Sequence, residues 1–187
     1  MRPVWVRLLS VVALAWFACT PVHATPDDEI AFGMERRLKA AFIYKFAQYI
    51  EWPADAFASP AAPLIVGIVG ADSIAEELQA ATEGHAVKDH PIVVQRIKPG
   101  ASIAAIQVLF VGKSEAARLS HWLNAVNRRP VLVITESEDA LEQGSTINFT
   151  TEERRVRFAI SLASADRNRL RIDSRLLGVA QRVYRTQ

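Results

Sequence analysis

Three short apolar runs stand in the middle of the chain: Leu64–Val69, Val108–Val111 and Val131–Thr135. Each run is continuously apolar rather than alternating, which is typical of strands buried on both faces of a sheet. Predicted helices follow the first two runs, at Ile74–Thr82 and Glu115–Asn127. This alternation of strands and helices predicts a mostly parallel central sheet flanked by helices, with right-handed crossovers.

A long helix is predicted before the first strand, from Asp27 to about Ile50. Acidic residues at its start favour the positive end of the helix dipole, and Pro53 ends it because the residue before a proline avoids the helical conformation. Val93–Ile97 is a further, shorter strand. Apolar positions of the helix recur on one face, interrupted by Lys45: Ile30, Met34, Leu38, Ala41, Phe42, Phe46 and Tyr49. Of these, the aromatic residues Phe42, Phe46 and Tyr49 are expected in the core.

The C-terminal stretch predicts a β-hairpin and a closing helix. Thr146–Phe149 and Val156–Ser161 are rich in β-branched and aromatic residues, and a polar turn joins them. Leu170–Ile172 is a candidate third strand. Asp173 or Ser174 then caps a helix with apolar residues at helical spacing: Leu176, Leu177, Ala180, Val183 and Tyr184. We therefore expect a single α/β domain in which the hairpin extends or edges the sheet.

The first residues have the pattern of a secretory signal peptide. Arg2 and Arg7 precede the apolar run Leu8–Ala18, and Val22-His23-Ala24 fits a small-x-small cleavage site. The run is too short for a transmembrane helix. We expect cleavage after Ala24, which gives a signal peptide at 1–24, a domain at 25–187 and a periplasmic location.

Charge and cysteine usage agree with export. Cleavage removes two of the 22 basic residues and none of the 20 acidic ones, so the mature chain is neutral and gives no case for nucleic acid. Cys19, the only cysteine, lies within the predicted signal peptide. Lipidation at Cys19 is an alternative, but Trp16 and Phe17 stand where a lipidation motif has small or leucine-type residues. The mature chain would then depend on core burial rather than on disulfides.

No motif indicates catalysis, a cofactor or a metal. Val111–Ser114 resembles the end of a phosphate-binding loop, but Gln107 stands where that motif needs glycine. The chain has no G-x-S-x-G elbow, and the strands lack the terminal aspartate of a phosphoacceptor domain. Only His85, His90 and His121 follow the signal peptide, which is too few ligands for a zinc site. An exported hydrolase is an alternative that lacks a nucleophile and a base.

Arginines concentrate near the C-terminus, and six of them are candidates for binding a partner or an anionic ligand: Arg155, Arg157, Arg167, Arg169, Arg171 and Arg175. Guanidinium groups bind carboxylates and phosphates, and the helix start at Asp173–Ser174 adds free N–H donors. Arg169 and Arg171 would share a face of an extended strand. Trp52 is a candidate docking residue or a partly buried anchor. The alternative is a solvent-exposed edge strand, whose charged side chains only prevent it from pairing with another chain.

Small polar and charged residues follow the three apolar strands: Asp72, Ser73, Lys113, Ser114, Glu136 and Ser137. In open parallel sheets, ligands bind in the crevice outside the carboxyl ends of the strands. These residues therefore predict a small-molecule site as an alternative to a protein-binding surface. The two are compatible, because a ligand can switch a protein-binding regulator.

Four sequence blocks resemble the YfiR family of exported bacterial proteins: K-A-A-F-I-Y-K-F-A-Q-Y-I-E-W-P at Lys39–Pro53, P-L-I-V-G-I-V-G at Pro63–Gly70, V-L-F-V-G-K-S-E at Val108–Glu115, and the tail G-x-x-I-N-F…V-R-F-x-I-x-L…L-R-I-x-S-R-L-L…A. Each block alone is weak, but their combination in this order is specific and covers nearly the whole mature chain. The resemblance implies a compact periplasmic α/β domain, often dimeric, with no catalytic motif to transfer.

The resemblance also implies a function. The best-understood role in the family is to bind the periplasmic part of an inner-membrane diguanylate cyclase and repress cyclic-di-GMP production. An outer-membrane lipoprotein can sequester the repressor, which promotes biofilm growth. A membrane sensor such as a histidine kinase is the alternative partner. Some relatives have disulfides, but the mature part of this chain has no cysteine, which excludes redox control by thiols once the signal peptide is cleaved.

Overall fold

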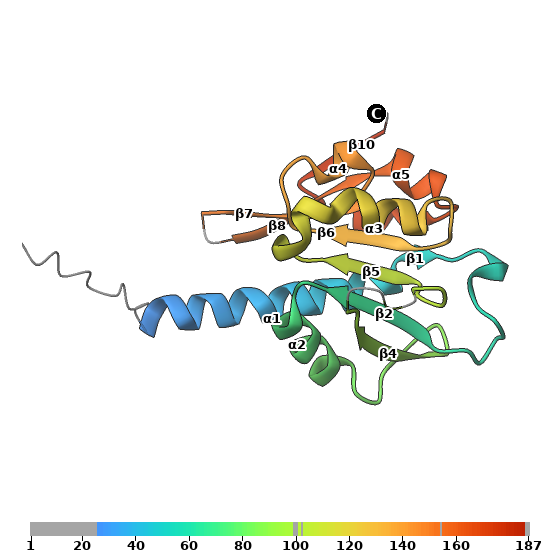
Figure 1. The fold of residues 1–187 in the computed structure, drawn as a ribbon, viewed down its shortest axis with the longest axis horizontal. Helices are drawn as coiled ribbons and strands as arrows, with labels where there is room; N and C mark the ends of the chain where they lie inside the picture. Colours follow the sequence, from blue (N-terminus) through green and yellow to red (C-terminus); the bar gives the residue numbers. More distant parts are fainter. Residues whose placement is uncertain (1–25, 99–100, 102, 154, 186–187) are drawn as a thin grey trace, which may run out of the picture.

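A computed structural model describes residues 26–98, 101, 103–153 and 155–185. Within them, a sheet of eight strands runs in the order β10-β8-β7-β6-β5-β2-β4-β3 (Figure 1). Its centre consists of three parallel strands, β2 (Leu64–Val69), β5 (Val108–Val111) and β6 (Leu132–Thr135). Nearly all residues of these strands are buried, as their continuous apolar runs predict.

Further strands, some parallel and some antiparallel to their neighbours, complete the sheet on both sides. β4 (His90–Arg96) lies parallel to β2, and β3 (Ala86–Val87) pairs antiparallel with β4 at one edge. On the other side β7 (Ile147–Glu152) lies parallel to β6, and β8 (Arg155–Ser161) forms the predicted hairpin with β7. The hairpin therefore extends the sheet, and the mostly parallel α/β fold is confirmed.

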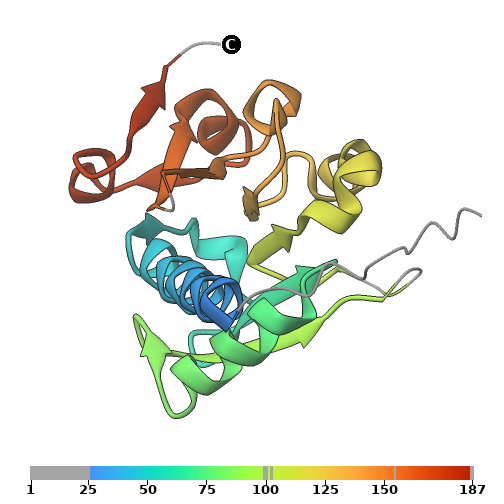
Figure 2. The same cartoon turned by 90° about the vertical axis from the view of Figure 1, so that its left-hand side faces the viewer.

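Helices cover both faces of the sheet (Figure 2). α1 (Pro26–Gln48) and α2 (Asp72–Thr82) share a hydrophobic core with one face of the central strands. α3 (Leu119–Val126) follows the 3-10 helix η2 (Lys113–Arg118) and packs on the other face through Leu119 and Trp122. The remaining helices are short: η1 (Ala54–Ala56), α4 (Ala140–Gln143), α5 (Leu162–Arg167) and α6 (Ser174–Leu177).

α1 is buried along its C-terminal half only. Its buried apolar residues, each at most 1% exposed, are Ala40, Ile43, Phe46 and Ala47. The Phe46 ring lies 4.7 Å from that of Phe158 on β8 and 5.6 Å from that of Phe149 on β7, measured between ring centroids. The first turns of the helix project beyond the sheet (Figure 1). Of the predicted apolar face, Phe42 and Tyr49 pack against the core, whereas Ile30, Met34 and Leu38 are exposed.

The C-terminus differs from the sequence prediction. The closing helix α6 has a single turn, and Val183 and Tyr184 lie in β10 (Arg182–Tyr184), which pairs parallel with β8. The Gln181 N–H donates to the Phe158 carbonyl at 2.9 Å and so begins this pairing. The candidate third strand is present as β9 (Arg171–Ile172), but it pairs with β1 (Ile50–Glu51) outside the main sheet.

The predicted signal peptide, with Cys19, lies outside the described residues. Among the residues that are described, no helix is both long enough and apolar enough to cross a membrane.

Candidate functional site

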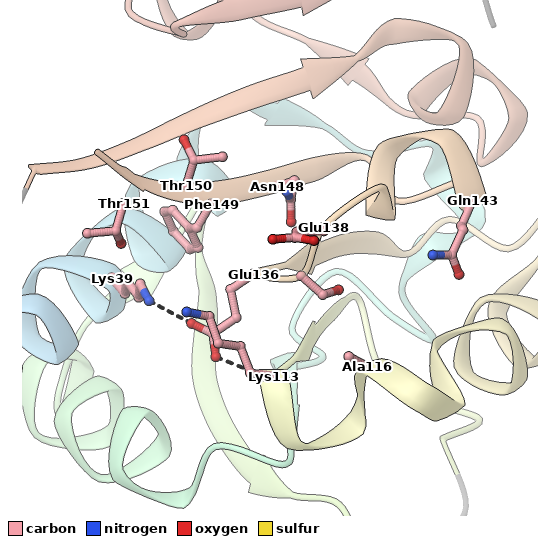
Figure 3. A pocket seen from close by; sticks show the side chains of 11 residues that line it. Lys39, Lys113, Ala116, Glu136, Glu138, Gln143, Asn148, Phe149, Thr150 and Thr151 are labelled. Carbon is pink, nitrogen blue, oxygen red and sulfur yellow. Dashed lines mark hydrogen bonds and ion pairs between the residues drawn. The ribbon is translucent and has the colours of Figure 1, made fainter. Parts of the chain in front are cut away.

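A pocket of about 630 Å³ lies where β5 and β6 end below the β7–β8 hairpin (Figure 3). β7 pairs with β6 only at Ile147 and Asn148, so the rest of β7 extends past the end of β6. Lys113 directly follows the turn after β5, and Glu136 directly follows β6, so both residues reach the same edge of the sheet. α1 adds Lys39 from the side.

Lys39 is the centre of an ion network in this pocket, although its side chain is only 4% exposed. Its Nζ lies 2.6 Å from Oε1 of Glu35 and 2.6 Å from Oε2 of Glu136. The other carboxylate oxygen of Glu136 accepts the backbone N–H of Lys113 at 3.1 Å. The Thr151 hydroxyl donates to Glu35 at 3.3 Å. The network thus ties α1 to the ends of three strands.

The charges in this network stabilise one another against the cost of burial. Burial alone would lower the pKa of Lys39, but hydrogen bonds and charge attraction from Glu136 and Glu35 raise it above its ordinary value. Burial would likewise raise the pKa of Glu35, yet Lys39 holds that pKa below its ordinary value. Lys39 and Glu35 are therefore expected to be ionised near neutral pH.

A second polar network lies beneath the pocket and fixes Asn148. The Thr135 hydroxyl donates to the Asn148 side-chain oxygen at 2.7 Å and lies 2.8 Å from the Ser145 hydroxyl. Ser145 in turn donates to the Ile147 carbonyl at 3.0 Å. Thr135 and Ser145 are fully buried, and their polar atoms are paired, as buried polar groups must be. The network holds the carboxamide of Asn148 at the pocket wall.

The structure brings three of the six strand-end residues together in this pocket. Lys113, Glu136 and Ser137 line it. The other three strand-end residues, Asp72, Ser73 and Ser114, are not among the lining residues. Ser114 instead donates to the Gly70 carbonyl at 2.8 Å, which ties the turns after β5 and β2 together.

Sequence reasoning missed several residues of this pocket. Lys39, Asn148, Thr150 and Thr151 line it as well. The spacing of Glu35 and Lys39, four positions apart on a helix, was the one local signal for the ion network. The hairpin threonines had no such signal, because their place depends on how far β7 extends past β6.

The pocket presents charged and polar groups that can bind a ligand. Lys113 and Glu138 are exposed and present opposite charges at its rim. Neither histidine nor cysteine is among the residues that line it. Across the described part of the chain, no group of three His, Cys, Asp or Glu residues could hold a metal ion. The pocket can accommodate a small polar ligand with charges of both signs.

The candidate arginines lie in two separate regions. Arg155 and Arg157 are exposed on β8, on the opposite face of the sheet from Val156 and Phe158, and form no ion pair within the described residues. Arg167 lies at the end of α5, beyond the far end of β8. β8 spans seven residues, or about 20 Å, so the hairpin pair is well separated from the others.

The remaining arginines surround the small β1–β9 sheet. Arg169 Nη1 lies 2.8 Å from Asp55 Oδ2, and Arg171 lies opposite Glu51 in the strand pairing. Arg169 precedes β9 in a left-handed conformation, so strand alternation does not place it on a face with Arg171. Arg175 pairs with Asp173 at 2.7 Å and lowers the pKa of that carboxyl to about 2.

Trp52 lies beside a second pocket, of about 480 Å³, with Phe57 and His90. The Trp52 ring meets Phe57 edge-on at 6.2 Å between centroids, and the Phe57 ring stacks on His90 at 3.7 Å. Trp52 is partly buried and packs against the main core, but its indole N–H has no hydrogen-bond partner. This placement fits a partly buried anchor.

Comparison with known proteins identifies the family. A family model described as YfiR/HmsC-like matches residues 36–181. The chain belongs to the YfiR/HmsC-like family. This family is periplasmic, and its known role is regulatory rather than catalytic. Among proteins of curated function, none matches this sequence.

A solved structure supports the fold of the YfiR/HmsC-like chain. It is a conserved domain protein from Vibrio cholerae O1 biovar El Tor strain N16961, with a TM-score of 0.55 and 11% sequence identity. The match covers 79% of this chain and 60% of that one, so this chain spans less than two thirds of the length of the Vibrio protein. At this identity the likeness shows the fold alone.

Proposed function

We propose that this protein is an exported, non-enzymatic regulator that binds the periplasmic part of an inner-membrane diguanylate cyclase and represses cyclic-di-GMP production. The observation that supports it is the YfiR/HmsC-like match across residues 36–181, which includes the core of the fold and its pocket. Export requires the proposed signal peptide at 1–24.

Repression by binding alone requires a difference in affinity between two states of the partner. The regulator binds an inactive arrangement of the cyclase more tightly than an active one and so shifts the population towards it. Moving an equilibrium from 1:99 to 99:1 requires about 10⁴-fold tighter binding to the favoured state. A homodimer of the regulator and capture by an outer-membrane lipoprotein belong to the same proposal.

The test is cellular cyclic-di-GMP in the native host, measured with and without this gene. Deletion should raise cyclic-di-GMP, and the full chain should restore the lower level. A chain that lacks residues 1–24 should not restore it, although it makes the same folded domain in the cytoplasm. An unchanged level on deletion, or equal rescue by both forms, would contradict periplasmic repression of a cyclase.

We place the contact with the cyclase at the hairpin arginines, Arg155 and Arg157, because both are exposed without an ion pair among the described residues. Arg155→Glu should weaken repression by reversing a charge at the contact, with about a tenfold loss of affinity or more. Arg171→Glu, at the opposite end of the domain, is the matched control and should still repress. Full repression by both variants would put the contact surface elsewhere.

A second candidate function is a periplasmic small-molecule sensor that acts through another membrane protein such as a histidine kinase. The pocket at the ends of β5 and β6 favours it, because its rim presents both an ammonium and a carboxylate group. A thermal-shift screen of small zwitterionic and anionic metabolites tests it. A ligand should raise the melting temperature of the wild type and not that of Lys113→Ala. No shift with any compound would contradict this candidate.

A further inference from the structure

One edge of the main sheet is open along most of β4. β3 pairs with β4 only at His90 and Pro91, so within the described chain no strand lies beside the stretch Ile92–Arg96 on the side away from β2 (Figure 1). An open edge presents unpaired backbone N–H and C=O groups, which can pair with a strand of another chain. The edge of β4 is therefore a candidate docking surface for an extended segment.

Two hydrogen bonds show which backbone groups face the open edge. The Ile97 N–H donates to a carbonyl of β2 at 2.8 Å, whereas the Ile92 N–H points the other way and donates to the His85 carbonyl at 3.3 Å. Backbone groups of successive strand residues point to opposite sides, and the register of β4 with β2 is unbroken along this stretch. Val94 and Arg96 thus direct both N–H and C=O away from β2. Neither residue has a backbone hydrogen bond on that side among the described residues.

α2 forms the wall of a groove along this edge. Glu76, Gln79 and Ala80 lie on one exposed face of α2, as their helical spacing requires. Glu83 follows at the end of the helix, and together with residues 92–94 of β4 these side chains line a groove of about 650 Å³, the α2–β4 groove. Several peptide-binding domains add an extended peptide to an exposed strand edge, where main-chain hydrogen bonds give affinity and pockets for alternate side chains give specificity. The α2–β4 groove offers both.

The middle of the open edge lacks the features that normally prevent pairing. Proteins protect exposed edges with charged residues, with proline or with very short strands. In β4 the proline and the one Lys or Arg residue stand at the two ends, at Pro91 and Arg96, and residues 92–95 between them are uncharged. Val93 is 38% exposed, and a neighbouring strand would cover it. The sequence of β4 therefore leaves its edge free to pair.

The charges of the groove favour a basic segment as its occupant. Glu83 is exposed and forms no ion pair among the described residues. Glu76 pairs with Arg96 at 3.1 Å, so the two carboxylates of the groove have a single guanidinium between them. A lysine or arginine of the incoming segment would complement Glu83. A second copy of this chain would bring to that position only its own Arg96, which is already paired with Glu76.

We propose that the α2–β4 groove binds an extended, basic segment of another protein, which adds to the sheet as a strand beside the five open residues of β4. The backbone of the segment pairs with Val94 and Arg96. Its alternate side chains face α2, with an apolar one over Ala80 and a basic one beside Glu83. This surface goes beyond the proposed function, because it lies at the other end of the strand order from the hairpin arginines. Its assays contain no cyclase, so the two proposals can succeed or fail separately.

Amide hydrogen exchange, followed by NMR, tests the open edge in the exported chain, residues 25–187. The N–H groups of Val93 and Gln95 face β2 and should exchange slowly. Those of Val94 and Arg96 should exchange about tenfold faster or more, because nothing in the described chain protects them. Equal protection of all four would mean that the edge is already covered. Protection of Val94 and Arg96 that rises with protein concentration would assign the edge to a second copy, and either result would overturn the proposal.

A designed peptide tests the groove itself. The probe is Thr-Thr-Val-Val-Lys, with fluorescein at its N-terminus and an amide at its C-terminus. Antiparallel addition to β4 places its central valine over Ala80 and its lysine beside Glu83. Fluorescence anisotropy should show saturable binding, and the same peptide with glutamate in place of lysine should bind about tenfold more weakly. Bound peptide should slow exchange at Val94 and Arg96. No saturable binding, or equal binding of the two peptides, would contradict the proposal.

Variants of α2 separate the groove from the rest of the surface. Ala80→Arg should weaken binding of the lysine peptide by about tenfold or more, because it fills the groove and adds a like charge. Ala81→Arg is the matched control, since Ala81 is the next exposed residue of the same helix and does not line the groove. Glu83→Lys should reverse the preference between the lysine and glutamate peptides. Circular dichroism checks that each variant is folded. Equal losses in Ala80→Arg and Ala81→Arg, or an unchanged preference in Glu83→Lys, would place the peptide elsewhere.

Discussion

The two halves of α1 use the same kinds of residue for different purposes. In the second half, Phe46 and Ile43 are fully buried and pack against the core. In the first half, Phe32 and Met34 are more than half exposed. The difference is that β7 and β8 lie over the second half, whereas the first half projects past the sheet. Apolar character therefore contributes to stability in the second half and remains exposed in the first.

The largest contrast should come from removing an aromatic ring in each half. Phe46→Ala should lower the free energy of unfolding by about 3–5 kcal/mol, because it leaves a cavity beside Phe149 and Phe158. Phe32→Ala should change it by less than about 0.5 kcal/mol, since that ring is mostly in water. Urea denaturation of dilute protein measures both, and equal losses would mean that the first half is also part of the core.

Lys39 lies where the two halves meet, and its loss should have the next largest effect. Lys39→Met keeps the length of the side chain but leaves the carboxylates of Glu136 and Glu35 without their cation. Breaking a buried pair in this way costs about 3 kcal/mol. Glu35 remains partly exposed and Glu136 keeps the Lys113 N–H, so the loss should not exceed that value. Urea denaturation at neutral pH measures it.

The pH dependence sharpens this prediction. Because the folded-state pKa of Glu35 lies below its ordinary 4.5, its contribution is complete above about pH 4.5 and is lost as the pH falls through the folded value. The raised pKa of Lys39 acts in the opposite direction, with a contribution complete below about pH 10.5 and lost as the pH rises through the folded value. The difference in melting temperature between wild type and Lys39→Met should therefore narrow in acid. A constant difference would contradict the ion network.

Backbone substitutions should give the smallest contrast. Gly33→Ala should stabilise the protein by about 0.5–1 kcal/mol, because alanine favours the helix and its Cβ would approach only the Arg36 guanidinium, at 3.9 Å. Ala47→Gly should destabilise it by about 1 kcal/mol or more, since it weakens the helix and removes a buried methyl group. Thermal melts of dilute protein compare the two, and a loss of stability for Gly33→Ala would place an unseen contact at that position.

The central strands were predictable from the sequence because their burial on both faces leaves only apolar residues. The bounds of β2 and β5 agree with the predicted runs, and the helix at 26–48 and the hairpin also agree. The buried face of α1 was predictable only in its second half. Met34 and Leu38 recur at the same helical spacing as core residues, and periodicity does not distinguish a core from a partner.

Long-range pairing explains the other differences. Val183 and Tyr184 have helical spacing, but pairing with β8 decides their conformation. The ion network of Lys39 had no complete signal in the sequence, because one of its carboxylates, Glu136, lies 97 residues away. The arginines formed a cluster in the sequence, yet β8 separates Arg155 from those that follow the strand by its full length. In each case a contact between distant segments outweighs the local pattern.

The packing of Phe46 on Phe158 also has a consequence for folding kinetics. The first helix of the domain completes its core only against strands near the other end of the chain, so this contact joins residues more than a hundred positions apart. Contacts of such long range slow folding, because the loop between them must close before they form. The first helix therefore cannot complete its core until the strand that carries Phe158 has also been synthesised. That delay suits a protein whose proposed route takes it through a membrane before it folds.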